Sequence, residues 1–246
     1  MMIILASDTS TSSGSVALRD PNGVLHREDL EGSKPHSETL LPAVENVLSR
    51  AGLKRGDIKA IAVGTGPGAF TGLRVGLATF KGWAAASALP LIPVVSMDAV
   101  AWPLLEEGFA AVVLSDARKG EVYAAYYPLP GKGSLPERSD EISLIPHSEV
   151  PEYIRSLKDP DARLVGTAVP FLVRAGYQFE GAAPVEGPGA PDALNILVLA
   201  EMLYSQGRAV APGDLVPTYV RSPDARKPSP GTVITGAGID GKCSER

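Results

Sequence analysis

Two segments carry residue types that could bind a phosphate group. Asp8-Thr9-Ser10 follows an apolar run and places a carboxylate beside two hydroxyls, a set that can position Mg²⁺ through water and contact phosphate oxygens. Segment 64–76 contains five glycines in thirteen residues and lies between an apolar run and a long apolar helical segment. Because the N–H groups at a helix N-terminus favour anions, this glycine-rich turn suggests a nucleotide site.

Both segments also have a simpler interpretation. The glycine-rich run lacks the Lys of a P-loop, contains Pro67 and has no partner acid where a dinucleotide fingerprint needs one. It is equally a tight turn that lets a helix pack closely on a sheet or on another chain. Asp, Thr and Ser form turns unaided, so we favour a plain turn at Asp8-Thr9-Ser10. Arg118, in the charged connection 115–119, is either part of a salt-bridged turn or a cation that reaches the cleft or a partner.

Other catalytic arrangements are missing from the sequence. His26, His36 and His147 have no metal-ligand spacing, and we expect them to be solvated polar side chains. The single cysteine, Cys243, excludes an intrachain disulfide and a cysteine-based metal site. No G-x-S-x-G elbow is present. We therefore expect neither a metal nor another cofactor, and no peptidase chemistry.

Composition limits the class of protein. The chain has 246 residues, of which 44% are hydrophobic and 21% charged, as in a soluble globular protein. Its net charge of −5 provides no basic field for nucleic acid, so any RNA would be held mainly by something else. The N-terminus has no basic region before its apolar run, and no apolar run reaches the length of a membrane helix. We expect a cytoplasmic protein without membrane contact.

Hydrophobic periodicity and turn residues predict the order of elements. The expected strands are 2–7, 15–19, 24–30, 58–63, 91–95, 110–114, 120–127 and 163–165. The expected helices are 38–51, 71–88, 96–107, 149–157, 170–175 and 193–206, with Ser37, Ser96 and Asp192 as caps. Segments 128–138 and 184–191 are predicted as loops, 217–221 as a short extended piece, and the chain from Ser222 onward as a mobile tail.

Four motifs together resemble one family. They are Asp8-Thr9-Ser10, the glycine-rich run 64–74, segment 116–123 (DARKGEVY) and segment 217–221 (PTYVR), in this order. The sequence resembles the TsaB (YeaZ) family, the dimerisation subunit of the bacterial tRNA threonylcarbamoyladenosine machinery, over residues 2–221. The resemblance implies an α/β, actin/Hsp70-like (ribonuclease H-like) two-lobed fold with a reduced second lobe. The lobes would be 1–103, closed by the helix 192–207, and 104–191, followed by the extended tail 217–246.

The resemblance also implies a function without catalysis. The family pairs with the TsaD transferase and the TsaE ATPase, which together modify the adenosine beside the anticodon of tRNA. TsaD-like relatives carry a metal-binding H-x-x-x-H, and this register holds Ser96 and Val100 here. Neither side chain could replace imidazole as a ligand for iron or zinc. We therefore expect an inactive paralogue that contacts tRNA only through the complex; the alternative is an actin-like ATP-binding enzyme, an ATPase or kinase.

The helices 38–51 and 71–88 are the expected partner surface, because the small residues of the second helix permit another helix to pack closely. It would bind the TsaD-type paralogue, or a second copy of the chain when that partner is absent. The expected partner-binding residues are Leu41, Glu45, Gly66, Pro67, Gly68, Phe70, Thr71, Gly72, Leu73, Arg74, Gly76 and Lys81. A vestigial nucleotide site or cleft would comprise Asp8, Thr9, Ser10 and Arg118. Changing Gly76 or Gly82 to a bulky residue is expected to weaken the heterodimer and leave the fold intact.

Overall fold

The structure is built on two five-stranded sheets with the same strand plan. It is a computed structural model that describes residues 2–131, 133–185 and 189–221. The first sheet has the order β3-β2-β1-β4-β5. Its strands are β1 (Ile4–Asp8), β2 (Ser15–Arg19), β3 (Leu25–Asp29), β4 (Ala60–Gly64) and β5 (Leu91–Val94). Strands β1 to β3 form an antiparallel meander, whereas β4 and β5 add in parallel on the other side of β1.

The second sheet repeats this plan with shorter helices and shorter outer strands. Its order is β10-β9-β6-β7-β8, so the meander β6-β7-β8 again continues through parallel strands on the far side of its first strand. The strands are β6 (Ala111–Asp116), β7 (Glu121–Tyr127), β8 (Ser143–Pro146), β9 (Arg163–Val165) and β10 (Ala183–Pro184). The reduction expected of this lobe is therefore found in its helices and in β8, β9 and β10, whereas β6 and β7 are longer than β1 and β2. Strand β8 is not anticipated from the sequence because it is short, ends in proline and lies at the sheet edge.

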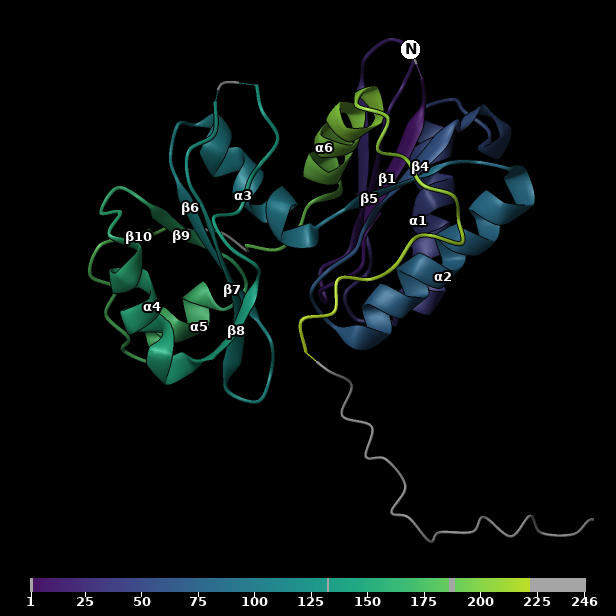
Figure 1. Ribbon diagram of the computed structural model, residues 1–246. Coiled ribbons are helices and arrows are strands. Elements are labelled where there is room, and N and C mark those ends of the chain that lie inside the picture. Colours follow the sequence, from purple (N-terminus) through teal and green to yellow (C-terminus); the bar gives the residue numbers. More distant parts are fainter. Residues whose placement is uncertain (1, 132, 186–188, 222–246) are drawn as a thin grey trace, which may run out of the picture.

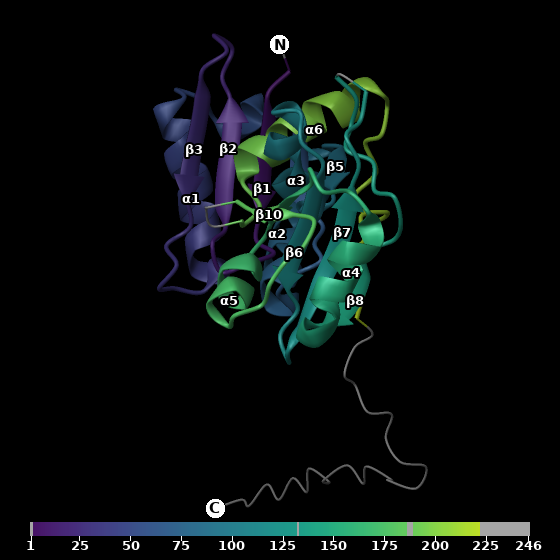
Figure 2. The ribbon, with the colours of Figure 1, turned by 90° about the vertical axis from the view of Figure 1, so that its left-hand side faces the viewer.

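Helices cover both sheets in layers (Figures 1 and 2). They are α1 (His36–Arg50), α2 (Phe70–Ser87), α3 (Ser96–Glu106), α4 (Val150–Leu157), α5 (Val169–Arg174) and α6 (Ala193–Ser205), with 3₁₀ turns at Arg55–Asp57 and His147–Glu149. Helices α1 and α2 pack on one face of the first sheet, and α6 packs on the other. Helix α3 packs between α6 and the second sheet, whose far face is covered by α4 and α5.

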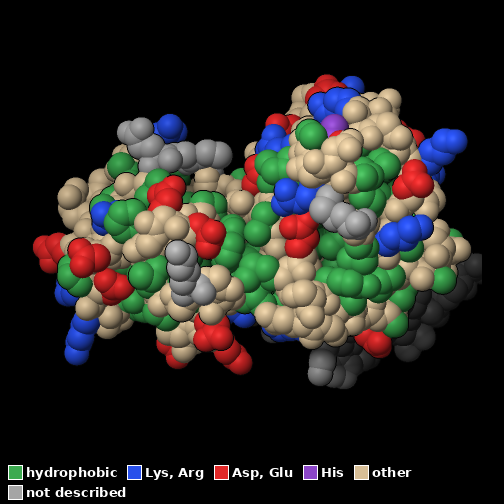
Figure 3. All heavy atoms as spheres, turned by 90° about the horizontal axis from the view of Figure 1, so that it is seen from above, with side chains coloured by type: hydrophobic (Ala, Val, Ile, Leu, Met, Phe, Trp, Pro, Cys, Tyr) green, Lys and Arg blue, Asp and Glu red, His purple; other side chains and the backbone are tan. Residues whose placement is uncertain are grey.

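The helix that follows the last strand of each sheet packs against the other sheet. After β5 the chain enters α3, whose apolar side chains join the core of the second sheet. After β10 it enters α6, which contributes instead to the core of the first sheet. The predicted boundary between residues 103 and 104 therefore falls inside α3, a helix shared by both lobes. Seen from above, hydrophobic side chains are clustered where the two lobes meet (Figure 3).

The predicted two-lobed α/β plan is confirmed, but two of the predicted helix caps are wrong. Helix α1 begins at His36, so Ser37 lies inside its first turn and caps nothing. Ser96 is the first residue of α3, and its hydroxyl is used elsewhere. Asp192 does cap α6, because its carboxylate accepts the N–H of Leu194 at 2.8 Å.

The end of the described chain lies along the first lobe. The predicted extended piece Pro217–Arg221 runs from α2 to the region between the lobes (Figure 1). The expected mobile tail from Ser222 onward lies outside the described residues. Within the parts of the chain that are described, no helix is long and apolar enough to cross a membrane.

Candidate functional site

The carboxylate of Asp8 is sealed inside the first lobe at the end of β1. Its exposed fraction is 1%, and both of its oxygens are hydrogen-bonded. Oδ1 accepts the backbone N–H of Ser10 at 2.7 Å and the Ser10 hydroxyl at 2.6 Å. Oδ2 accepts the Ser96 hydroxyl at 2.5 Å. Burial raises the pKa of Asp8 above its ordinary value of 3.8, although the hydrogen bonds from Ser10 and Ser96 oppose this shift.

The Asp8 network joins three segments that are distant in the sequence. The Ser96 hydroxyl, at the start of α3, also accepts the N–H of Gly66 at 2.9 Å. Gly64 leaves the space for this arrangement, because a Cβ there would lie 1.8 Å from Asp8 Oδ2. Asp8 thus fastens the turn after β1 to the glycine-rich turn and to α3. This structural role differs from Mg²⁺ positioning, which the sequence offers as the alternative to a plain turn.

Thr9 is also engaged with α2 and does not face a cavity. Its hydroxyl donates to the carbonyl of Gly72 at 2.9 Å, and the residue is 2% exposed. A Cβ on Gly72 would lie 2.2 Å from the Thr9 carbonyl oxygen, and one on Gly76 would lie 2.3 Å from Thr9 Oγ1. The glycines of α2 therefore allow this helix to approach the turn after β1 within one chain.

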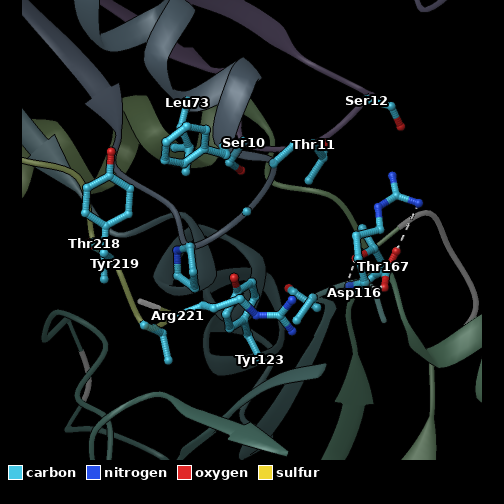
Figure 4. A pocket seen from close by; sticks show the side chains of 18 of the residues that line it. Ser10, Thr11, Ser12, Leu73, Asp116, Tyr123, Thr167, Thr218, Tyr219 and Arg221 are labelled. Carbon is cyan, nitrogen blue, oxygen red and sulfur yellow. Dashed lines mark hydrogen bonds and ion pairs between the residues drawn. The ribbon is translucent and has the colours of Figure 1, made fainter. Parts of the chain in front are cut away.

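A cavity of about 880 Å³ lies between the lobes. Its walls come from the turn after β1, the start of α2, the β6–β7 connection and the last described segment, and they include Ser10 and Arg118 but neither Asp8 nor Thr9. Figure 4 shows Ser10, Thr11 and Leu73 on one side of it, and Asp116 and Thr167 on the other. Of the predicted cleft residues, the structure therefore brings Ser10 and Arg118 to the cavity wall.

Arg118 lies in a turn with unusual backbone angles. Arg118, Lys119 and Gly120 have φ values of 62°, 56° and 77°, in the left-handed region. The Arg118 side chain is 80% exposed and its guanidinium lies 3.4 Å from the Asp116 carboxylate. The turn is held by the Asp116 carboxylate, which accepts the Arg118 N–H at 2.8 Å. Arg118 thus combines both sequence interpretations, a salt-bridged turn and a cation at the cavity.

Burial divides the predicted partner-binding residues into two groups. Gly66, Pro67, Gly72, Leu73 and Gly76 are buried. They cannot form a surface in this structure, and the clash of a Gly76 Cβ with Thr9 corrects the expectation that a bulky residue there would spare the fold. Gly68 is half-buried, and its Cβ would lie 2.2 Å from the Ser10 carbonyl oxygen. Gly82, by contrast, is exposed and has open space at its Cβ.

The other predicted residues lie on the outer sides of α1 and α2, and all but the half-buried Lys81 are exposed. Leu41 on α1 is 43% exposed, Phe70 at the start of α2 is 46% exposed, and Thr71, the next residue after Phe70, is also exposed. The Arg74 guanidinium carbon lies 3.6 Å from the centre of the Phe70 ring, a cation–π contact. Glu45 is exposed and pairs with Arg55 at 2.6 Å. Lys81 is already engaged within the chain, because its ammonium donates to the Leu215 carbonyl at 2.9 Å.

None of the histidines is an isolated, solvated side chain as the sequence predicts. His26 Nε2 lies 3.1 Å from the Asp20 carboxylate. His36 Nε2 lies 2.7 Å from the Thr11 carbonyl oxygen. The ring of His147 packs against Phe171 with 5.3 Å between centroids. Across the described residues, no three His, Cys, Asp or Glu side chains are grouped so that they could hold a metal ion.

A second carboxylate, the half-buried Asp98, holds the loop before β8. Arg138 forms an ion pair with it, and the Tyr127 hydroxyl donates to it at 2.9 Å. Burial raises the pKa of Asp98, and the Arg138 charge opposes the shift. Burial and the neighbouring Asp98 carboxylate raise the pKa of Tyr127 well above 10. The arrangement anchors this loop to α3 and β7.

Several functional contacts escape sequence reasoning. Ser96 looks like a helix cap, and its bond to Asp8 spans 88 positions. Thr65 and Thr218 lie 153 positions apart, yet their hydroxyl oxygens are 3.0 Å from each other. The ion pair between Glu121 and Arg221 joins two motifs that the sequence shows only as separate runs. For Thr65, Thr218, Glu121 and Arg221, membership in the motifs is the one signal that could have pointed to these contacts, and Ser96 lies outside the motifs.

Comparison with known proteins gives a consistent result. A family model described as TsaD: tRNA N6-adenosine threonylcarbamoyltransferase matches residues 25–142. The chain is 34% identical to the Escherichia coli tRNA threonylcarbamoyladenosine biosynthesis protein TsaB, covering 94% of this chain and 99% of that protein. It is 31% identical to the Haemophilus influenzae protein of the same name, covering 94% and 98%.

Solved structures agree with these relatives. A Pseudomonas aeruginosa structure described as an uncharacterized protein with similarity to peptidase YEAZ has a TM-score of 0.77 and 29% identity, covering 90% of this chain and all of that one. A structure of YeaZ from the same organism has a TM-score of 0.75, also at 29% identity. Identities of 34% and 31% over nearly the full length of relatives named TsaB, together with the similarity to the YeaZ structure, lead to one conclusion: this chain belongs to the TsaB (YeaZ) family of tRNA threonylcarbamoyladenosine biosynthesis proteins.

Proposed function

We propose that this protein is a non-catalytic scaffold that binds a TsaD-type transferase and supports it, with a TsaE-type ATPase, in threonylcarbamoylation of the adenosine next to the tRNA anticodon. The name of its relatives places them in this biosynthesis, and the family model that matches the chain describes the transferase. The observation that carries the proposal is the exposed surface on α1 and α2 with Leu41, Phe70 and Arg74.

This surface has the composition of a binding hot spot. Aromatic and arginine side chains dominate the energetics of protein interfaces, and here Phe70 and Arg74 are stacked together on α2. Phe70 is 46% exposed and Leu41 is 43% exposed, so a partner could bury further apolar surface on both side chains. Thr71, which is exposed next to Phe70 in the chain, adds a polar group. The same surface would join two copies of the chain when the partner is absent.

The interior of the first lobe supports a structural role. The carboxylate at the end of β1 is fully engaged by Ser10 and Ser96 and does not face the cavity. The two positions of the metal-binding motif hold Ser96, which is bonded to Asp8, and Val100, which is 5% exposed in the core. The Ser96 bond lies in the first lobe, whereas Val100 packs in the core of the second sheet, and neither side chain is a metal ligand.

Partner affinity tests the proposal directly. Titration of the full chain into the TsaD-type protein should give a saturable complex, and Phe70→Ala should weaken it by at least about 2 kcal/mol, roughly 30-fold. Phe171→Ala is the matched control, because Phe171 is 55% exposed but lies on α5 of the second lobe. Equal losses in both variants, or none in Phe70→Ala, would remove this surface from the interface.

A modification assay tests the absence of catalysis. Formation of threonylcarbamoyladenosine in tRNA should require the partner proteins and should increase with this chain until the complex is saturated. Phe70→Ala should lower the yield only at protein concentrations near the dissociation constant. Product formed by this chain alone would contradict the scaffold role.

One observation favours a second candidate function, an actin-like ATP-binding enzyme. The cavity of about 880 Å³ is large enough for a nucleotide and has Ser10 and Arg118 on its walls. Calorimetry with Mg-ATP on the isolated chain distinguishes the two candidates. Micromolar binding would favour the enzyme, and binding weaker than millimolar would favour the scaffold.

A further inference from the structure

The last described segment, Leu215–Arg221, crosses from the first lobe to the second. Leu215 is 2% exposed in the core between the first sheet and its two helices, and its carbonyl accepts the Lys81 ammonium at 2.9 Å. The N–H of Thr218 donates to the Thr65 carbonyl at 2.8 Å, and the two hydroxyl oxygens lie 3.0 Å apart. These contacts fix the segment on α2 and on the residue after β4.

The far end of the segment is held by the second lobe. Arg221 forms an ion pair with Glu121, the first residue of β7, and both side chains are largely buried, at 21% and 31% exposure. Between the two anchors, Thr218 to Arg221 line the cavity between the lobes (Figure 4). The segment therefore connects the two lobes along one wall of this cavity.

The same segment contributes to the exposed surface on α2. The centroid of the Tyr219 ring lies 6.0 Å from that of the Phe70 ring. The Phe70 ring also contacts the Arg74 guanidinium. Tyr219 is 49% exposed and Phe70 is 46% exposed. Tyr219 is one residue beyond the anchor Thr218 and two before the anchor Arg221. Its position therefore depends on both lobes at once.

We propose that Leu215–Arg221 is a latch that couples the Phe70–Arg74–Tyr219 cluster to the angle between the lobes. While the Arg221–Glu121 pair is formed, the lobes stay together and Tyr219 stays beside Phe70. When the pair is broken, the lobes separate and the cavity opens, and Tyr219 leaves the cluster. Because coupling is reciprocal, a partner that buries the cluster stabilises the closed arrangement of the lobes. This second half of the proposal rests on the proposed function.

Distance measurements on the isolated full chain test the latch. Spin labels at Ser49→Cys on α1 and Ser156→Cys on α4, with Cys243→Ser, report the separation of the lobes by pulsed electron resonance. Glu121→Gln should shift the distribution to longer distances and broaden it. Arg221→Gln breaks the same pair from the other side and serves if the first variant does not fold. The exchanged pair Glu121→Arg with Arg221→Glu should restore the original distribution.

Glu201→Gln is the matched control. It breaks the 3.0 Å pair with Arg19, which has similar exposure but joins two elements of the first lobe. It should leave the distances between the labels unchanged. Distances unchanged in both latch variants, or a charge exchange that restores nothing, would overturn the latch.

Affinity for the TsaD-type protein tests the coupling. Glu121→Gln should weaken binding roughly fivefold, about 1 kcal/mol, although Glu121 lies on the second lobe away from α2. Lobes that loosen with no change in affinity would overturn the coupling. If the unmodified chain does not bind the partner at all, the proposed function and the coupling are both wrong. The spin-label distances would still show whether the Arg221–Glu121 pair holds the lobes together.

Discussion

The Asp8 carboxylate and the Ser96 hydroxyl lie 2.5 Å apart in the interior of the first lobe, at the ends of segments separated by 88 positions. Ser96 donates to Asp8 and accepts from the N–H of Gly66, so one hydroxyl connects β1, the glycine-rich turn and α3. A carboxylate at the end of β1 looks available for a metal-bound phosphate in the sequence. In the structure, both oxygens of this carboxylate accept hydrogen bonds from Ser10 and Ser96 of the same chain.

Removing this hydroxyl should destabilise the chain. Ser96→Ala leaves the Gly66 N–H and one Asp8 oxygen buried without their partner, so we expect a loss of about 1–3 kcal/mol in the free energy of unfolding. Urea unfolding followed by circular dichroism measures the loss. Ser156→Ala, at an exposed serine of α4, should change stability by less than about 0.5 kcal/mol. Equal stability of the two variants would show that the Ser96 bonds contribute little.

The buried Asp8 should also make stability depend on pH. Its pKa is raised in the folded chain above the ordinary 3.8, so the folded chain binds this proton more tightly than the unfolded chain. The contribution of Asp8 to the free energy of unfolding is therefore fully present below pH 3.8 and is lost as the pH rises through the raised folded pKa. Asp8→Asn removes this titration.

The difference in unfolding free energy, Asp8 chain minus Asp8→Asn chain, should therefore fall as the pH rises from about 4, and level off above the folded pKa. Urea unfolding of both chains over a series of pH values between 4 and 8 measures it. A difference that increases with pH would show that the hydrogen bonds from Ser10 and Ser96 outweigh the cost of burial.

Two glycines of α2 should respond oppositely to the same substitution. A methyl group at Gly76 would lie 2.3 Å from Thr9 Oγ1, so Gly76→Ala should lower the free energy of unfolding by about 1–3 kcal/mol. Gly82 has open space at its Cβ, and Gly82→Ala should raise stability by about 0.5–1 kcal/mol because alanine favours the helix. Thermal unfolding of both variants gives the comparison. A stabilising Gly76→Ala would mean that α2 does not approach Thr9 this closely.

Much of the fold could be predicted from the sequence because its signals are local. Strand β2 and strand β9 occur at the predicted residues, and Gly52 ends α1 with a φ of 66°. Alternation of apolar residues and turn composition determine such elements over a few positions. Strand β8 was missed because its four residues, with a proline at the end, carry neither a clear alternation nor a strong strand composition.

The sequence by itself determined the family, through motifs in a fixed order, and the elements that present them. The tertiary structure decided what the motif residues do. The Asp8 carboxylate is buried and accepts the Ser96 hydroxyl. Gly72 and Gly76 lie close against Thr9, and the Lys81 ammonium donates to the Leu215 carbonyl. These contacts join residues at least 60 positions apart. They cannot be predicted from the sequence because local periodicity specifies which face of an element is buried, but does not specify which distant group that face contacts.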